Sequence, residues 1–284
     1  MKRFAVVGAN GQVGKAFVAA CQAKGLTCVA YDRSTLDVTD NNAIFRLFAE
    51  DTFDVLVNCT AYNFVDKAES EPDVAYAVNA DAVSEMAYFC DKYAKKFVHY
   101  STDFVFDGAK KSPYTEEDEP NPQNVYGKSK RAGERAVLDQ CDDALVLRVS
   151  WVIGDGTQNF LYKVSQWAKD GRELRVADDE ISVPTFADDI VRMTFAALDK
   201  SLCGLYHLCS SGSASRFTLT KEYARLIGLT NSIVPCSMSE FAASYPAKRP
   251  GYSAMSNEKI CAATGLVMPA WDRAMEHYVK GAVC

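Results

Sequence analysis

Strand-like and helix-like stretches alternate along the first half of the chain. Five short apolar or β-branched runs predict strands, at residues 3–7, 26–31, 54–59, 96–100 and 144–149. Four stretches with apolar residues at helical spacing predict helices, at residues 11–24, 40–50, 73–93 and 125–140. Strands that alternate with helices form parallel sheets covered on both faces. The fold class is therefore predicted to be α/β, with a Rossmann-like doubly wound sheet.

After Ser150 the pattern is less regular, and a smaller C-terminal lobe is expected. Three helices and one strand are predicted there, at residues 189–198, 217–227, 270–280 and 205–209. The dinucleotide-binding domain is predicted to comprise residues 1–150, with later segments, about 183–210 and 265–284, returning to it. The substrate-binding lobe is predicted to comprise residues 151–182 and 211–264.

Composition narrows the function classes. The chain has 284 residues and is 48% apolar, which is enough to bury a sizeable core. Its net charge of −6 argues against general binding to nucleic acid or to anionic membranes. We expect a cytoplasmic protein, because no apolar run is long enough to span a bilayer and the N-terminal one is too short for a signal peptide. The ten cysteines form no CxxC pair and are expected to be reduced.

A glycine-rich loop follows the first predicted strand. The segment Gly-Ala-Asn-Gly-Gln-Val-Gly at 8–14 fits GxxGxxG and opens a predicted helix. Small residues let backbone amides approach a pyrophosphate at a helix N-terminus. The loop therefore predicts a dinucleotide site, although the same residues can also form a tight turn without a ligand. The residues expected to bind the cofactor are Gly8, Asn10, Gly11, Gln12, Val13 and Gly14.

Two residues at the end of the second predicted strand favour different cofactors. The carboxylate of Asp32 can bind the ribose diol of NAD, whereas Arg33 can neutralise the 2′-phosphate of NADP. The sequence therefore leaves NADH and NADPH open. Asp37 and Val38 are expected to flank the adenine, on position alone.

A carbonyl reductase needs a proton donor beside the carbonyl oxygen. A tyrosine can serve when a cation four residues later on the same helix face lowers its pKa. The pattern Tyr-x-x-x-Lys occurs twice, at Tyr88 with Lys92 and at Tyr126 with Lys130. Ligands bind beyond the carboxyl ends of parallel strands, and only the second pair is expected there. Thr102, beside Ser101 at the end of the fourth strand, offers a hydroxyl for the same carbonyl.

With these motifs, the chain resembles the dTDP-4-dehydrorhamnose reductase family of the extended short-chain dehydrogenase/reductases. The matching motifs run in the family's order over nearly the whole chain: residues 8–14, 65–69, 101–108, 126–130, 132–134, 148–152, 159–160, 184–185, 204–208 and 249–250. The resemblance implies hydride delivery from NADPH or NADH to the C4 ketone of a dTDP-4-keto-6-deoxyhexose, with dTDP-4-dehydro-L-rhamnose as the leading candidate.

The resemblance also implies a role for individual residues. Tyr126 is expected to protonate the C4 oxygen, Thr102 to bind it, and Lys130 to lower the pKa of Tyr126 and hold the nicotinamide ribose. Trp151 is expected to pack on the deoxysugar ring, with ordinary core packing as the alternative. The other implied contacts are Cys59 and Ala61 for the cofactor, and Asn63, Val65, Asp103 and Arg249 for the nucleotide sugar.

Three segments depart from the family pattern without touching the three catalytic residues. They contain Asn63 before Val65, Glu180 and Ser182 before Pro184, and Tyr252 after Arg249. These departures leave the reductase chemistry in place and put the particular nucleotide sugar in question. Some family members bridge a homodimer with a divalent ion through a glutamate, where this chain has Ala16. No metal is therefore predicted, while a homodimer stays open.

Two alternative functions are compatible with the sequence. One is a nucleotide-sugar epimerase or dehydratase of the same superfamily; dehydratases add an acidic pair after the threonine, whereas here only Asp103 follows it. The other is a non-catalytic NADP-binding subunit like the regulatory subunit of methionine adenosyltransferase. A lost catalytic triad would favour the second alternative, and the triad is intact here.

Overall fold

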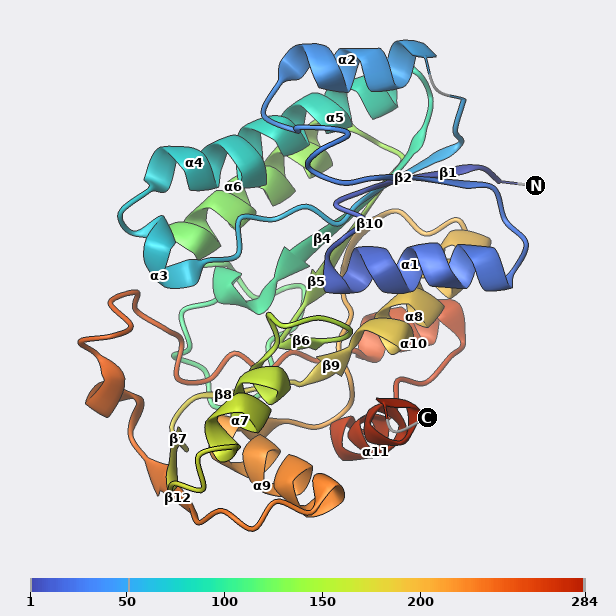
Figure 1. Ribbon diagram of the computed structural model, residues 1–284. Helices are drawn as coiled ribbons and strands as arrows, with labels where there is room; N and C mark the ends of the chain where they lie inside the picture. Colours follow the sequence, from blue (N-terminus) through green and yellow to red (C-terminus); the bar gives the residue numbers. More distant parts are fainter. Residues whose placement is uncertain (1, 51, 283–284) are drawn as a thin grey trace.

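Six parallel strands form a central sheet in the computed structural model, which describes residues 2–50 and 52–282 (Figure 1). The strands lie in the order β10-β5-β4-β3-β1-β2. Their bounds are β1 (Phe4–Val7), β2 (Cys28–Tyr31), β3 (Val55–Asn58), β4 (Lys96–Thr102), β5 (Ala144–Val149) and β10 (Gly204–His207). The predicted strands and the doubly wound α/β class are confirmed. β4 continues through Ser101 and Thr102, so these residues end the strand rather than follow it.

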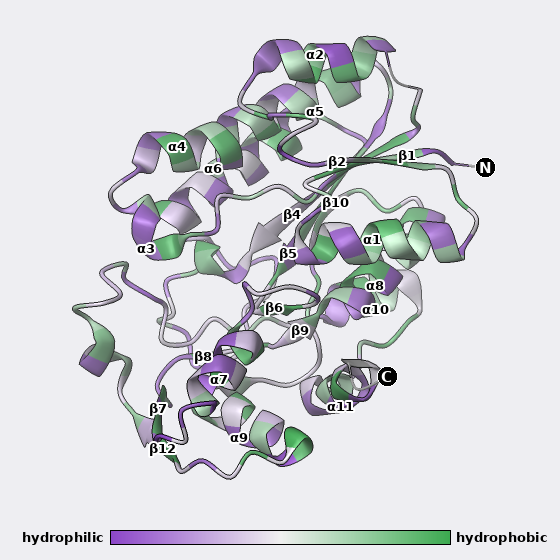
Figure 2. Cartoon of the chain, viewed as in Figure 1, coloured by the Kyte–Doolittle hydropathy of each residue, from purple (hydrophilic) through white to green (hydrophobic). Residues whose placement is uncertain are grey.

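Helices cover both faces of the sheet, which explains why β1, β3, β4 and β5 are buried along their whole length. On one face lie α2 (Asn41–Glu50), α5 (Ala82–Lys92) and α6 (Val125–Gln140), and on the other α1 (Gln12–Ala23), α8 (Ala187–Asp199) and α10 (Glu258–Thr264) (Figure 1). Figure 2 shows hydrophobic and hydrophilic residues on the same helices, as expected when one side packs on the sheet and the other meets water.

The helix predicted over residues 73–93 contains a π-helical turn. α4 (Pro72–Tyr76) leads through the turn Ala77–Asp81 into α5. The turn carries Asn79, which is fully buried. Its amide accepts from the Tyr62 backbone N–H at 2.8 Å and donates to the Ser129 hydroxyl at 3.0 Å. One extra residue in the turn thus brings a polar side chain between the loop after β3 and α6.

Gly133 of α6 packs closely against the backbone of the π-helical turn. A Cβ added at this glycine would lie 2.1 Å from the Asn79 carbonyl oxygen, which is backbone and cannot move aside. We expect Gly133→Ala to lower the free energy of unfolding by about 2–3 kcal/mol, as overpacking does. Gly281→Ala is the matched control, because Gly281 is also helical and has open space around it. Urea denaturation of both variants measures the difference, and equal stabilities would contradict the prediction.

The lobe consists of short strand pairs and helices from the C-terminal half (Figure 1). The pairs are β6 (Val152–Ile153) with β9 (Thr185–Phe186), β7 (Leu174–Ala177) with β12 (Ile233–Cys236), and β8 (Ile181–Ser182) with β11 (Ala214–Ser215). The helices are α7 (Phe160–Ala168), α9 (Arg216–Ile227) and α11 (Trp271–Ala282). A further short helix, α3 (Val65–Ala68), follows the loop after β3. The sequence pattern did not predict α7, α10 or these strand pairs.

Two C-terminal helices pack differently from the expected division. α10, expected in the lobe, inserts Ile260 into the core between α8 and the sheet. α11, expected to return to the sheet, packs Ala274 and Met275 against Leu219 of α9 in the lobe. The two helices thus exchange the places that the spacing along the chain suggested for them. Residues 283–284 of the expected 265–284 segment lie outside the described residues.

Two further findings concern membrane spans and the state of the cysteines. Over the described residues, no helix combines the length and apolar character needed to cross a membrane. Nine cysteines in the described part are free thiols, and the tenth, Cys284, lies outside it.

Candidate active site

A cavity of about 630 Å³ opens beyond the carboxyl ends of β4 and β5, between the sheet and the lobe. Its wall contains side chains from both parts, as expected for a ligand site at this edge of a parallel sheet. Eight of the predicted site residues line it: Gln12, Asn63, Val65, Thr102, Asp103, Tyr126, Trp151 and Arg249.

The glycine loop lies at the start of α1 and leaves the backbone accessible. Gly8 has φ +78°, and a Cβ there would lie 2.8 Å from the backbone of Cys59. A Cβ on Gly14 would lie 2.4 Å from the Gly8 carbonyl oxygen. No side chain caps α1 at Gly11, so the amides of its first turn remain available to an anion. This glycine cradle fits the pyrophosphate of a dinucleotide.

The neighbouring acidic residue is also oriented toward the loop. Asp32 accepts hydrogen bonds from the Asn10 amide at 2.8 Å and from the Ser34 hydroxyl at 2.6 Å. The Ser34 bonds hold the pKa of Asp32 below its usual value, so the side chain is an anion at neutral pH. Arg33 is exposed beside it.

The two residues expected at the adenine, Asp37 and Val38, follow β2 and stay a prediction. Val38 is buried in the core on the α2 side of the sheet, and Asp37 accepts from Thr39 in an exposed turn. The hydrophobic side chain of Val38 packs inward, whereas Asp37 stays at the surface.

Tyr126 stands at the first turn of α6, where the chain is tightly held. Asn124 caps the helix by accepting from the Gly127 N–H at 2.7 Å, and its amide donates to the Lys248 carbonyl at 2.8 Å. The Tyr126 ring packs edge-on against Phe104, with centroids 5.7 Å apart. Burial raises the pKa of Tyr126 to about 12, although a hydrogen bond with Thr102 opposes the shift. Tyr126 therefore keeps its proton at neutral pH.

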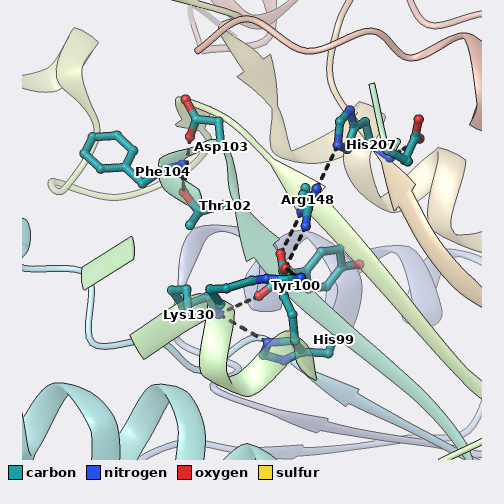
Figure 3. Close-up of polar contacts among 11 residues, drawn as sticks. His99, Tyr100, Thr102, Asp103, Phe104, Lys130, Arg148 and His207 are labelled. Carbon is teal, nitrogen blue, oxygen red and sulfur yellow. Dashed lines mark hydrogen bonds and ion pairs between the residues drawn. The ribbon is translucent and has the colours of Figure 1, made fainter. Parts of the chain in front are cut away.

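Lys130 lies one turn further along α6 and points into the protein (Figure 3). Its Nζ donates to the Tyr100 carbonyl at 2.7 Å and lies 3.4 Å from His99 Nε2. Burial lowers the pKa of Lys130 to about 8. Burial has the largest influence on the pKa of Tyr126, and Lys130 is not among the residues that line the cavity. The predicted role of Lys130 toward Tyr126 and the nicotinamide ribose stays a prediction.

Asp103 organises the threonine at the end of β4. Its carboxylate accepts hydrogen bonds from Thr102 at 3.1 Å, from Ser182 at 2.7 Å and from Ser253 (Figure 3 shows the first). Burial raises the pKa of Asp103, and the two serine hydroxyls are the strongest opposing influence. Both oxygens expected near the sugar hydroxyls are thus occupied by protein donors, two of which come from the lobe.

Trp151 meets a cation that the sequence did not single out. The guanidinium carbon of Arg216 lies 3.5 Å from the Trp151 ring centroid, and Arg216 forms an ion pair with buried Glu180 at 3.5 Å. Trp151 has φ +38°, a strained value for a side chain of this size. Its buried Nε1 has no hydrogen-bond partner in the described part of the chain. The Arg216 guanidinium therefore lies on the Trp151 ring, which was expected to pack on the deoxysugar.

The remaining predicted residues have several local partners. The Arg249 guanidinium donates to both carboxylate oxygens of Asp66, at 2.5 and 3.0 Å. Gln12 reaches β6, accepting from the Gly154 N–H at 2.8 Å, and so connects the glycine loop with the lobe. Asn63 donates to Gln158 at 3.4 Å across the cavity. Cys59 and Ala61 follow β3, and the backbone of Cys59 lies against Gly8.

Sequence reasoning missed most of the lobe's contribution. The cavity is also lined by Lys163, Trp167, Arg172, Arg175, Arg216, Met238, Phe241 and Tyr245. From this part of the chain, the sequence singled out only Trp151 and Arg249 as site residues and Glu180 as a departure from the family pattern. The other residues lie in irregular segments where no periodicity marks an inward side chain.

A doubly wound parallel sheet whose carboxyl edge brings a tyrosine and a threonine to one cavity is the arrangement of short-chain dehydrogenase/reductases, here with an added lobe. Within that class, the chain belongs to the RmlD substrate binding domain family, whose model matches residues 1–284.

Relatives agree with this assignment over nearly their full length. The dTDP-4-dehydrorhamnose reductase of Mycolicibacterium smegmatis is 34% identical over 287 residues, covering 99% of this chain and 86% of that protein. The crystal structure of a dTDP-4-dehydrorhamnose reductase from Clostridium acetobutylicum has a TM-score of 0.95 and 32% identity, covering 99% of this chain and 100% of that chain. The Bacillus anthracis enzyme, solved in complex with NADP, has a TM-score of 0.94 and 31% identity, covering 99% of each chain.

Proposed function

We propose that the chain is an NAD(P)H-dependent reductase of the C4 ketone of a dTDP-4-keto-6-deoxyhexose, with dTDP-4-dehydro-L-rhamnose as the substrate and dTDP-L-rhamnose as the product. The observation that carries the proposal is that Tyr126, Thr102 and Trp151 line one cavity at the carboxyl edge of the sheet. Relatives named dTDP-4-dehydrorhamnose reductase support it, since they align with 96–99% of this chain.

The protein groups supply a proton and hold the substrate. Tyr126 keeps its proton at neutral pH and can donate it to the C4 oxygen as that oxygen gains charge. Thr102 is held by Asp103 and by the Phe104 N–H at 3.2 Å, so its hydroxyl stays beside the tyrosine. The Trp151 and Arg216 pair offers a flat, cationic surface to the sugar.

The glycine loop and Asp32 would hold the cofactor. The cradle at Gly8 and Gly14 accepts a pyrophosphate against the backbone, and Asp32 accepts from a ribose hydroxyl. When bound, the nicotinamide supplies the hydride. We propose NADPH or NADH without a choice between them, because anionic Asp32 and exposed Arg33 favour different cofactors.

The epimerase or dehydratase alternative receives less support. The Thermus thermophilus UDP-glucose 4-epimerase, solved with NAD, shares the fold with a TM-score of 0.80 but only 18% identity. The acidic residue after Thr102 is bonded to three hydroxyls, which leaves it poorly placed to exchange protons with a sugar.

Oxidation of the nicotinamide tests the proposed function. dTDP-4-dehydro-L-rhamnose is generated in situ, and the loss of nicotinamide absorbance is followed with NADPH and, separately, NADH. Turnover with either supports the reductase, and the ratio of kcat/KM values identifies the preferred cofactor. If the cofactor binds but no turnover occurs, the rhamnose assignment is wrong, and another keto sugar or the non-catalytic subunit becomes the better explanation.

Arg216 is expected to contribute to substrate binding. Arg216→Met keeps an unbranched apolar stem but removes the charge above Trp151 and leaves Glu180 without its ion pair. We expect kcat/KM for the nucleotide sugar to fall about tenfold or more, mainly through KM, because a charged hydrogen bond contributes about 1.5–3 kcal/mol. Cofactor affinity should not change. Arg192→Met, at an exposed pair with Asp189, is the matched control. An unchanged KM in Arg216→Met would exclude Arg216 from the substrate site.

A further inference from the structure

A buried chain of polar groups runs from β3 through β4 to Lys130. Asn58 and His99 are register partners on adjacent strands, and their side chains meet at 3.1 Å. His99 in turn lies 3.4 Å from Lys130 Nζ (Figure 3). Asn58 and His99 are fully buried, and Lys130 is 1% exposed. Every donor in this row therefore needs an acceptor within the protein.

The orientation of the Asn58 amide follows from its neighbours. Asn58 Oδ1 lies 2.9 Å from the Thr60 backbone N–H and 2.6 Å from the Thr60 hydroxyl. A backbone N–H can only donate, so the atom facing it must be the amide oxygen. The amide NH2 group therefore faces His99 and donates to Nδ1. Burial is the main cause that lowers the pKa of His99 well below its usual value, so the ring is neutral.

A neutral ring that accepts at Nδ1 carries its proton on Nε2, which points at Lys130. An ammonium group has three donors and no lone pair, so two donors would then face each other in a dry interior. A neutral amine removes the conflict, because its lone pair accepts from His99 Nε2–H while its own N–H donates to the Tyr100 carbonyl at 2.7 Å.

We propose that His99 is a positioning residue which, held by Asn58 with its proton on Nε2, donates to Lys130 and keeps that side chain a neutral amine while the two are in contact. Protonated Lys130 has to give up the contact with His99, so the charge of this lysine and its position are coupled. The arrangement itself does not depend on the proposed function. Its consequence for catalysis does, because only the charged form can lower the pKa of Tyr126.

Other groups around Lys130 are consistent with the proposal. The Cys59 thiol, directly after β3, lies near Lys130, and the Glu134 carboxylate lies one turn further along α6; both favour the charged lysine. Glu134 is engaged by Arg148 at 2.8 Å and by Arg131 at 3.0 Å, which offsets its negative charge. Burial outweighs both groups and lowers the pKa of Lys130 to about 8, so the charged form predominates at pH 7 and the neutral amine in contact with His99 predominates above about pH 8.

The tautomer of His99 can be measured directly in the wild-type protein without cofactor or substrate. In ¹⁵N NMR of histidine-labelled protein, His99 is one of three histidines and is assigned by its absence from His99→Gln. We expect an unprotonated Nδ1 and a protonated Nε2 at neutral pH. A proton on Nδ1, or on both nitrogens, would overturn the proposal. The tautomer is measured without turnover. The proposal for His99 can therefore be wrong while the reductase assignment is right, and the reductase assignment can be wrong while the proposal for His99 is right.

The effect on Lys130 is measured by its pKa. In ¹³C-lysine-labelled protein, the Lys130 signal is identified by its loss in Lys130→Met and titrated in wild type and His99→Gln. Glutamine can offer an oxygen to an ammonium, so the pKa of Lys130 should rise by about one pH unit or more. His277→Gln, at an exposed position on α11, is the control and should leave it unchanged. A folded His99→Gln with an unchanged Lys130 pKa would contradict the proposal, and if that variant does not fold, the wild-type tautomer alone decides.

Discussion

Tyr126→Phe is expected to reduce kcat for the keto sugar by about 10²–10⁴-fold, the usual contribution of a positioned general acid. Phenylalanine keeps the ring that packs on Phe104 and loses only the hydroxyl that hydrogen-bonds Thr102. The fold should persist, because the Tyr126 hydroxyl takes no part in holding the start of α6. That start is held by the Asn124 cap on the Gly127 N–H and by the close packing of Gly127 against the Phe104 backbone. Nicotinamide oxidation measures the rate, and quenching of protein fluorescence by NAD(P)H measures cofactor binding.

The second Tyr-x-x-x-Lys pair provides the control for this variant. Tyr88 is 49% exposed, and Lys92 lies over its ring at 5.6 Å, on the surface of α5. Tyr88→Phe should therefore leave kcat and KM unchanged. If Tyr126→Phe retained most of the activity while Tyr88→Phe was also normal, the proton would have to come from another group, and the proposed role of Tyr126 would be wrong.

Arg148→Met is expected to lower the free energy of unfolding by about 3–5 kcal/mol, because it leaves a buried carboxylate without its main partner. Arg148 and Glu134 are both fully buried and are joined by two parallel hydrogen bonds of 2.8 Å. Arg131, which is 25% exposed, keeps one contact with Glu134 and places the effect toward the lower end. Denaturation in guanidinium chloride measures the loss.

Two further variants separate the charge effect from general loss of packing. Arg3→Met removes an ion pair with Asp54 in which both side chains are more than 40% exposed, and should cost at most about 1 kcal/mol. Adding Glu134→Gln to Arg148→Met removes the unpaired charge and should recover part of the stability. If the double variant were less stable than Arg148→Met, the loss would reflect packing around Arg148 rather than the buried charge on Glu134.

The first half of the chain was predictable because its elements are defined by neighbours along the sequence. β3 reads as an apolar run because both of its faces are covered, and α6 reads as a helix because inward positions recur at helical spacing. The choice of Tyr126 over Tyr88 also followed from local order, since only one of the two lies on a helix that starts at the carboxyl edge of the sheet.

The lobe was harder to predict, because its strand pairs are two to four residues long and its partners are distant. Ser182 and Ser253 bond Asp103 across 79 and 150 residues of sequence. No periodicity encodes such a contact. Arg216 is an ordinary helix residue by pattern, and only the fold places it on Trp151.

The sequence by itself thus determined the succession of strands and helices in the first half of the chain, the glycine loop at 8–14 and the choice of Tyr126, which lines the cavity. Each of these features depends on residues a few positions apart. The tertiary structure decided which groups surround them. It placed Lys130 against His99, brought Arg216 onto Trp151, and exchanged the places of α10 and α11. The physical reason is that these outcomes depend on buried volume and on hydrogen-bond partners supplied by distant segments, which a local pattern does not contain.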